Sequence, residues 1–203
     1  MAKTDRAAVA RAVEELLRAL GHDPEREAEL RGTGARVADL WLDELIAGEG
    51  IDLGSLFEGA IACGADAPLV VVERLATHVV CPHHLTIGQG FASIAYLPGG
   101  RVAGLGAIAE LVDACCKRLV LQEDAGRDVA RALCEHLGAR GAACRLELRH
   151  GCLELHGPKK RGARVTTLAL AGCFERDPAE RALAVAALIG PSERRTSSKR
   201  AAR

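Results

Sequence analysis

Residues 69–80 read LVVVERLATHVV, and they lead directly into Cys81-Pro82-His83-His84. The run is rich in β-branched residues, which favour a β-strand. Residues 88–97, GQGFASIAYL, have the same character, and the Pro98-Gly99-Gly100 turn ends them. The sequence therefore predicts two strands, with a cysteine and two histidines where the first one ends.

The elements that follow complete the pattern. Apolar residues at helical spacing predict helices over about 106–119 and 122–138, and residues 142–149 and 164–174 are strand-like. A short helix over about 178–189 closes the order strand, strand, helix, helix, strand, strand. This order predicts an α+β fold, an antiparallel sheet with helices on one face. Its open edges favour assembly of several copies.

The first third of the chain is different. Apolar positions at helical spacing predict a helix over 5–20, with Gly21 as its stop, and a second helix over about 34–46. A loop rich in Gly and Asp then extends to about residue 67. We divide the chain into an N-terminal helical extension (1–66), an α+β domain (67–190) and a disordered basic tail (191–203).

Composition excludes several classes of protein. The 203 residues contain 27 Lys and Arg against 27 Asp and Glu, so no net basic charge favours nucleic acid or an anionic membrane surface. No apolar run reaches the roughly 18 residues of a membrane span, and the first 20 residues lack the apolar core of a signal peptide. We therefore expect a cytoplasmic protein that binds neither nucleic acid nor a membrane.

The cysteines fall into two groups. Without an export signal, the eight cysteines are expected to be reduced. Five lie in apolar periodic stretches and are expected to be small core residues: Cys115, Cys116, Cys134, Cys144 and Cys173. Cys81 and Cys152 differ, because each has a histidine close by in the sequence.

Cys81 and His84 follow one predicted strand, and His150-Gly151-Cys152 follows another. Zinc prefers thiolate and imidazole ligands in a tetrahedron, so Cys81, His84 and Cys152 would leave a fourth position for water, as in catalytic sites. A structural zinc site, closed by His83 or His150, and ordinary loop residues without a metal are the alternatives.

Several motifs resemble the GTP cyclohydrolase I family, in matching order and at matching intervals. They are Cys81-Pro82-His83-His84, Ala95-Tyr96-Leu97-Pro98, Gly104-Leu105, Arg118-Leu119, Gln122-Glu123, His150-Gly151-Cys152 and Gly172-Cys173-Phe174. The resemblance covers about residues 8–190. It implies the tunnelling fold, in which sheets from several subunits close into a barrel, and a homo-oligomer, often a decamer, with active sites between subunits.

The resemblance also implies roles for single residues. Cys81, His84 and Cys152 match the ligands of a catalytic Zn²⁺, while His83 and His150 match the histidines that handle protons. Gln122 and Glu123 match the region that binds the purine substrate, and we expect a buried Glu123 carboxylate to accept from guanine N1–H and the exocyclic amine. The implied reaction is hydrolysis at C8, which opens the imidazole ring and releases the carbon as formate.

The sequence departs from the family where the triphosphate is held. Gly106, Ala107 and Glu110 occupy positions at which the family typically has Ser, Lys and Arg, and His156 replaces another Arg. Pro82 replaces a Glu. Each lost charge-assisted contact is worth about 1.5–3 kcal/mol, so several together would weaken triphosphate binding by orders of magnitude.

Three hypotheses follow. The first is a zinc-dependent hydrolase that opens a guanine-like purine without a triphosphate, such as a base, a nucleoside or 8-oxoguanine. The second is an orthodox GTP cyclohydrolase I that makes dihydroneopterin triphosphate, with a phosphate clamp rebuilt from Lys159, Lys160, Arg161 or Arg164. The third is a non-catalytic assembly module that keeps zinc for structure.

Overall fold

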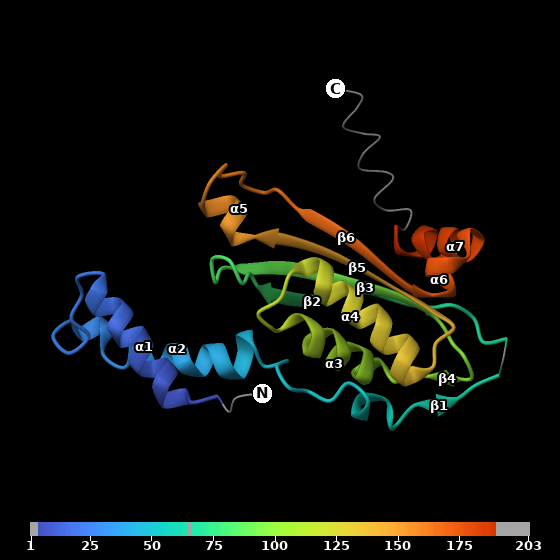
Figure 1. The fold of residues 1–203 in the computed structure, drawn as a ribbon, viewed down its shortest axis with the longest axis horizontal. Coiled ribbons are helices and arrows are strands. Elements are labelled where there is room, and N and C mark those ends of the chain that lie inside the picture. Colours follow the sequence, from blue (N-terminus) through green and yellow to red (C-terminus); the bar gives the residue numbers. More distant parts are fainter. Residues whose placement is uncertain (1–3, 65, 190–203) are drawn as a thin grey trace.

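The computed structural model describes residues 4–64 and 66–189. The basic tail predicted for 191–203 lies outside these residues. Figure 1 shows a twisted sheet with two long helices across one face and a pair of helices projecting from one end. Among the described residues, none of the helices has the length and apolar character needed to span a bilayer.

Four antiparallel strands form the main sheet, in the order β2-β3-β5-β6. They are β2 (Val70–Val80), β3 (Ile87–Leu97), β5 (Gly141–His150) and β6 (Val165–Gly172). Val80 is paired with Ile87, and Gly88 with His150, so the end of β2, the start of β3 and the end of β5 are neighbours. A separate two-stranded ribbon pairs β1 (Ile61–Ala62) with β4 (Arg101–Val102).

Helices α3 (Leu105–Cys116) and α4 (Gln122–Ala132, continued by a π-helical turn over Leu133–Leu137) cover one face of the sheet. The core between them is almost entirely aliphatic, as the shortage of aromatic residues requires. Fully buried members include Ile94, Ile108, Leu111, Val129, Leu133, Leu146 and Leu148. The expected α+β sheet with helices on one face is confirmed.

The N-terminal extension consists of α1 (Arg6–Ala19) and α2 (Thr33–Leu40), which pack on each other. A π-helical turn (Trp41–Leu45) continues α2, and two 3₁₀ turns span Ala28–Leu30 and Ser55–Phe57. The Gly48 N–H donates to the Lys117 carbonyl at 2.9 Å, which ties the extension to the end of α3. The boundary at residue 66 stays a prediction, and Phe57 packs in the main core.

Three further helices complete the chain: α5 (Gly151–Leu155), α6 (Cys173–Arg176) and α7 (Pro178–Leu188). The Asp177 carboxylate caps α7 by accepting from the Ala179 N–H at 2.8 Å. The predicted long elements are all present, with ends within a few residues. The sequence did not predict α5, α6, β1 or β4, and the last strand ends at Gly172 rather than 174 because α6 begins there.

Candidate metal centre and active site

The loop between β2 and β3 presents the first half of the site. Its ends are joined by two backbone hydrogen bonds, from Leu85 N–H to the Cys81 carbonyl and from Cys81 N–H to the Thr86 carbonyl, both at 2.9 Å. Leu85 takes a positive φ of 53° to close this turn. The result leaves the Cys81 side chain buried beneath the loop and the His84 side chain exposed at its tip.

The end of β5 presents the second half. His150 is the last residue of the strand, and Cys152 lies in the first turn of α5. Because β3 pairs with both β2 and β5, its first residues lie beside both segments. This sheet order explains how residues about 70 positions apart in the sequence come together at one end of the sheet, where Figure 1 shows α5 beside the β2–β3 turn.

Cys81, His84 and Cys152 form a compact donor set, with their ligand atoms all within 4.8 Å of one another. Two sulfurs and one imidazole nitrogen are the donors of a three-ligand zinc site. The Thr86 hydroxyl is buried without a hydrogen-bond partner among the described residues, and its side chain lies against Gly151. The fit to a zinc ion rests on the two sulfurs and the imidazole, since the Thr86 hydroxyl makes no hydrogen bond to either sulfur.

His150 stands beside this donor set, and its surroundings are specific. Its Nε2 lies 2.7 Å from Oε1 of Gln122, at the start of α4. Gly88 lies against the same ring, and a Cβ at Gly88 would approach Nδ1 and Cε1 to 2.8 Å. Burial lowers the pKa of His150 below its usual range, and the nearby Glu123 carboxylate partly offsets this effect.

Gln122 and Glu123, the predicted substrate-binding pair, occupy different environments. Gln122 is buried, and its amide is engaged within the protein. Glu123 is exposed and lines a groove of about 430 Å³ between α4 and β6 with Arg127 and Arg131. The expectation that Glu123 is buried is therefore wrong for the single chain, because the first turn of α4 directs this carboxylate outward.

Two further histidines lie near His84. The ring of His83, a predicted catalytic residue, is exposed, and its centroid lies 6.3 Å from that of His84. The His156 ring lies closer, at 5.3 Å, just after α5. His156 is thus a neighbour of the candidate metal centre. From the sequence it could be described only as a position where the family has an arginine.

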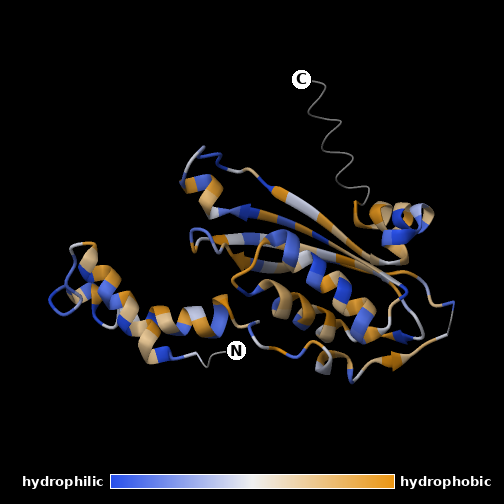
Figure 2. Cartoon of the chain, viewed as in Figure 1, coloured by the Kyte–Doolittle hydropathy of each residue, from blue (hydrophilic) through white to orange (hydrophobic). Residues whose placement is uncertain are grey.

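The basic cluster of Lys159, Lys160, Arg161 and Arg164 forms the loop between α5 and β6, which Figure 2 shows as a strongly hydrophilic segment. Arg164 is already engaged, because its Nη1 lies 2.5 Å from a Glu147 carboxylate oxygen on β5. The three other side chains are exposed.

Gly106, Ala107 and Glu110 lie in the first half of α3, which begins after β4 at the opposite end of the sheet. The end of α3 adjoins the candidate metal centre, since Val80 N–H donates to the Arg118 carbonyl at 3.0 Å. At about 1.5 Å per residue, Gly106 lies roughly 15 Å before the end of the helix. Within one chain these positions are remote from Cys81.

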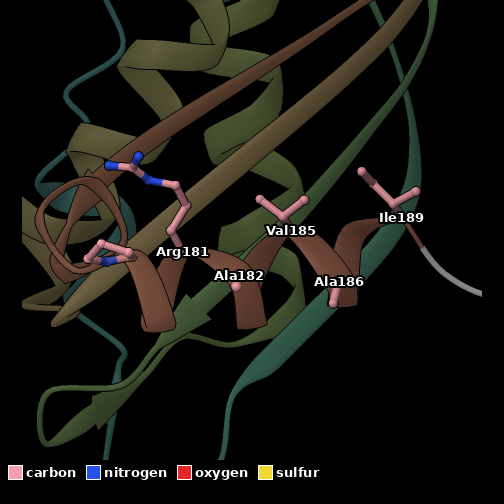
Figure 3. A pocket seen from close by; sticks show the side chains of 6 residues that line it. Arg181, Ala182, Val185, Ala186 and Ile189 are labelled. Atoms are coloured by element: carbon pink, nitrogen blue, oxygen red, sulfur yellow. The ribbon is translucent and has the colours of Figure 1, made fainter.

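A second cavity, of about 460 Å³, lies along α7 and has a different character. Figure 3 shows it lined by Val185, Ala186 and Ile189 from one face of the helix, with Arg181 at one end. The Arg181 guanidinium is occupied by the carbonyls of Phe174 and Glu175. Among the described residues that line it, this cavity therefore has no group free for acid–base chemistry or metal binding.

The other cysteines are structural to different degrees. Cys115, Cys116 and Cys144 are buried, and burial raises the pKa of Cys115 and of Cys116 to about 12. Such thiols stay neutral and unreactive. The prediction of core positions is confirmed for these three, whereas Cys134 and Cys173 are only partly buried.

Comparison with known proteins identifies the family of the chain. The family model for GTP cyclohydrolase I matches residues 9–189. The chain is 43% identical over 177 residues to GTP cyclohydrolase 1 of Chromobacterium violaceum, covering 85% of this chain and 83% of that protein. It is 40% identical over 176 residues to the Mycobacterium ulcerans protein of that name (86% of each) and 37% identical over 184 residues to the Bacillus pumilus one (90% and 95%). Because the family model and these relatives each match most of the chain, the chain belongs to the GTP cyclohydrolase I family.

Proposed function

We propose that this chain is a cyclohydrolase that opens the imidazole ring of GTP at C8 and releases that carbon as formate. The observation that carries the proposal is the Cys81–His84–Cys152 donor set with the His150 imidazole beside it. The relatives named GTP cyclohydrolase 1 support GTP as the substrate.

Cys81, His84 and Cys152 would hold the zinc ion, which when bound supplies Lewis-acid activation of water for hydrolysis. The protein groups contribute positioning and proton transfer. The buried Cys81 and the partly buried Cys152 fix the centre to the sheet, while the exposed His84 leaves one side of it open. A purine could approach from that side.

His150 is the best-placed proton carrier. Its ring lies against Gly88, and its Nε2 is held by Gln122. We propose that Nδ1 accepts a proton from the attacking water and delivers it to the ring nitrogen that leaves C8. His83, exposed on the β2–β3 loop, is proposed as a second proton carrier.

Glu123 is proposed to recognise the base. An ionised carboxylate accepts hydrogen bonds only, which suits the N1–H and exocyclic amine of guanine and not adenine, which lacks both donors in that arrangement. Its position at the mouth of the α4–β6 groove leaves the carboxylate accessible to such a ligand.

We propose that the complete site requires more than one copy of the chain. The groove that contains Glu123 runs along β6, an edge strand, and the α3 positions matching the phosphate region lie at the far end of the sheet. A neighbouring copy could bring its α3 next to this chain's Cys81. A homo-oligomer with sites between subunits follows.

A second candidate substrate, a guanine-like purine without a triphosphate, is favoured by one specific observation. Gly106, Ala107, Glu110 and His156 offer no permanent cation, and Arg164 is paired with Glu147. A triphosphate carries about four negative charges and is typically bound by Lys or Arg. For GTP as the substrate, Lys159, Lys160 and Arg161 would have to act as a replacement clamp.

Turnover of zinc-loaded protein on GTP, guanosine, guanine and 8-oxoguanine tests both candidates. We expect formate and dihydroneopterin triphosphate from GTP, with a KM that rises when Lys159, Lys160 and Arg161 are all replaced by Ala. Turnover of guanosine or 8-oxoguanine with none of GTP would replace the first candidate by the second. Bound zinc with no turnover of any purine would contradict both.

A further inference from the structure

Gln122 makes a hydrogen-bond arrangement that is unusual for a residue expected to bind substrate. Only 2% of its surface is exposed. Its side-chain nitrogen lies 3.0 Å from the Leu146 carbonyl, 3.0 Å from the Val165 carbonyl and 3.1 Å from the Thr167 hydroxyl. Its two N–H groups are thus used within the protein, on strands β5 and β6.

These contacts fix the orientation of the amide. Carbonyl oxygens only accept hydrogen bonds, so the Leu146 and Val165 carbonyls require the nitrogen of Gln122 on their side. The amide oxygen must then face His150, whose Nε2 lies 2.7 Å away. Since this oxygen only accepts, the His150 Nε2 must carry a hydrogen.

Gly88 makes room for the ring. A side chain at this position would collide with Nδ1 and Cε1, because its Cβ would lie 2.8 Å from each. Gly88 pairs with His150 across β3 and β5, so the absence of a side chain lets the imidazole lie against this strand and reach Gln122. A neutral imidazole with a hydrogen on Nε2 has its lone pair on Nδ1.

We propose that Gln122 is a positioning residue, which acts through His150 by holding the ring in place with its hydrogen on Nε2, so that Nδ1 is the nitrogen able to accept a proton. The inference rests on the proposed function, in which His150 carries the proton. It departs from the expectation that Gln122 contacts the substrate, since every polar atom of its side chain already has a protein partner.

Replacing Gln122 by Met keeps the volume and removes the acceptor. We expect kcat to fall about 10- to 100-fold, the scale seen when a partner that orients a functional imidazole is lost. KM should stay within about twofold, because no substrate contact is removed. A raised KM with unchanged kcat would instead identify Gln122 as a substrate-binding residue and overturn the proposal.

The His150→Ala background provides the matched control. If Gln122 acts only through His150, adding Gln122→Met to His150→Ala should lower kcat no further. A second, additional loss would contradict the proposal. Zinc content and the unfolding midpoint of each variant show whether the fold is kept. Gln122→Asn, which keeps a buried amide but is too short to reach both β6 and His150, serves if the Met variant does not fold.

A neutron crystal structure of the unaltered protein tests the inference without any turnover. Hydrogen on Nε2 of His150 is the expected result, and hydrogen on Nδ1 alone would overturn the proposal. This measurement also separates the two claims. Absence of turnover on any purine would remove the proposed function, whereas the hydrogen position would still decide whether Gln122 sets the state of the ring.

Discussion

Among single side chains, Cys152 offers the most direct test of the metal centre. It is partly buried on the short α5 helix, and its replacement by Ser removes a thiolate without opening the main core. We expect bound zinc to fall from about one ion per chain to a small fraction of that, since zinc prefers sulfur to hydroxyl ligands. Metal analysis after dialysis against a chelator measures this.

Cys63→Ser is the matched control for this prediction. Cys63 is also partly buried, but its N–H donates to the Gly100 carbonyl at 2.9 Å, next to β4 at the other end of the sheet. This variant should keep its zinc. Full zinc retention by Cys152→Ser would show that the donor set does not bind metal through that sulfur.

His156 is the side chain at which the substrate question can be decided. Its ring lies 5.3 Å from that of His84, so an arginine there would place a guanidinium at the mouth of the candidate site. For GTP as substrate, we expect His156→Arg to lower KM about 10-fold or more, the value of one charge-assisted contact. KM for guanosine should not change.

Steady-state kinetics with His22→Arg as control checks this prediction. His22 is exposed in the N-terminal extension, where it contacts Glu27. The His22→Arg variant therefore adds the same charge far from the site. An unchanged KM for GTP in His156→Arg would mean that no phosphate passes near this position.

For single residues, the sequence predicts the candidate metal ligands better than it predicts the surroundings of the neighbouring side chains. Cys81, His84 and Cys152 could be predicted because thiol and imidazole groups recur at strand ends. The environment of Gln122 could not, since it depends on carbonyls of Leu146 and Val165, 24 and 43 residues away. The exposure of Glu123 likewise depends on how α4 lies against β6.

Between elements, the contact most open to test is the ion pair that joins β5 to β6. Glu147 is only 16% exposed and contacts both Arg145 and Arg164. Burial alone would raise the pKa of Glu147, but the two arginines outweigh it and lower the pKa below its usual value. We expect Glu147→Gln to reduce the free energy of unfolding by about 1 kcal/mol at neutral pH.

The sign of the pH dependence follows from the lowered pKa. Glu147 contributes stability above its unfolded pKa of about 4.3, and this contribution is lost as pH falls through the lower folded value. Chemical unfolding at pH 7 and at about pH 3 should therefore show a difference between Glu147→Gln and the parent that disappears in acid. Glu58→Gln, at an exposed carboxylate elsewhere, is the control. A difference that persists in acid would contradict the ion-pair origin.

The junction between β6 and α6 depends on one glycine. Gly172 has φ 64° and ψ −134°, a conformation essentially restricted to glycine, and a Cβ there would lie 2.3 Å from the Arg140 carbonyl oxygen. We expect Gly172→Ala to cost about 2 kcal/mol or more in unfolding free energy. Gly59→Ala, where nothing lies within 4 Å, should change it little, and equal effects would contradict the steric argument.

The long elements could be predicted because each repeats its apolar pattern several times. Residues 69–80 and 88–97 were predicted as strands and form β2 and β3 almost residue for residue. The ribbon of Ile61–Ala62 with Arg101–Val102 could not be, since two-residue strands contain no period and exist only through their partner. The five-residue α5 has too few turns to leave a signal, yet it carries Cys152.

Within the described residues, β6 and most of β2 have no strand paired on their outer edges. The two edge strands, β2 and β6, carry the apolar side chains Val71 and Leu168 with 37% and 40% of their surfaces exposed. Leu16 and Leu20 on α1 are exposed to a still greater extent. A sequence can indicate such edges. The number of copies that close a ring depends on the angle between neighbouring copies, and no residue pattern encodes this angle.

Leu168→Lys tests the assembly, because a charge on an edge strand opposes pairing with another chain. For the parent we expect an oligomer by light scattering, and for Leu168→Lys a mass near that of one chain. The variant should keep its zinc, since Cys81, His84 and Cys152 all lie within one chain, yet lose turnover, because Glu123 and α3 would no longer meet across copies. Leu183→Lys, at a side chain on α7 that is 51% exposed, should leave the assembly intact. A fully active single chain would show that one copy builds the whole site.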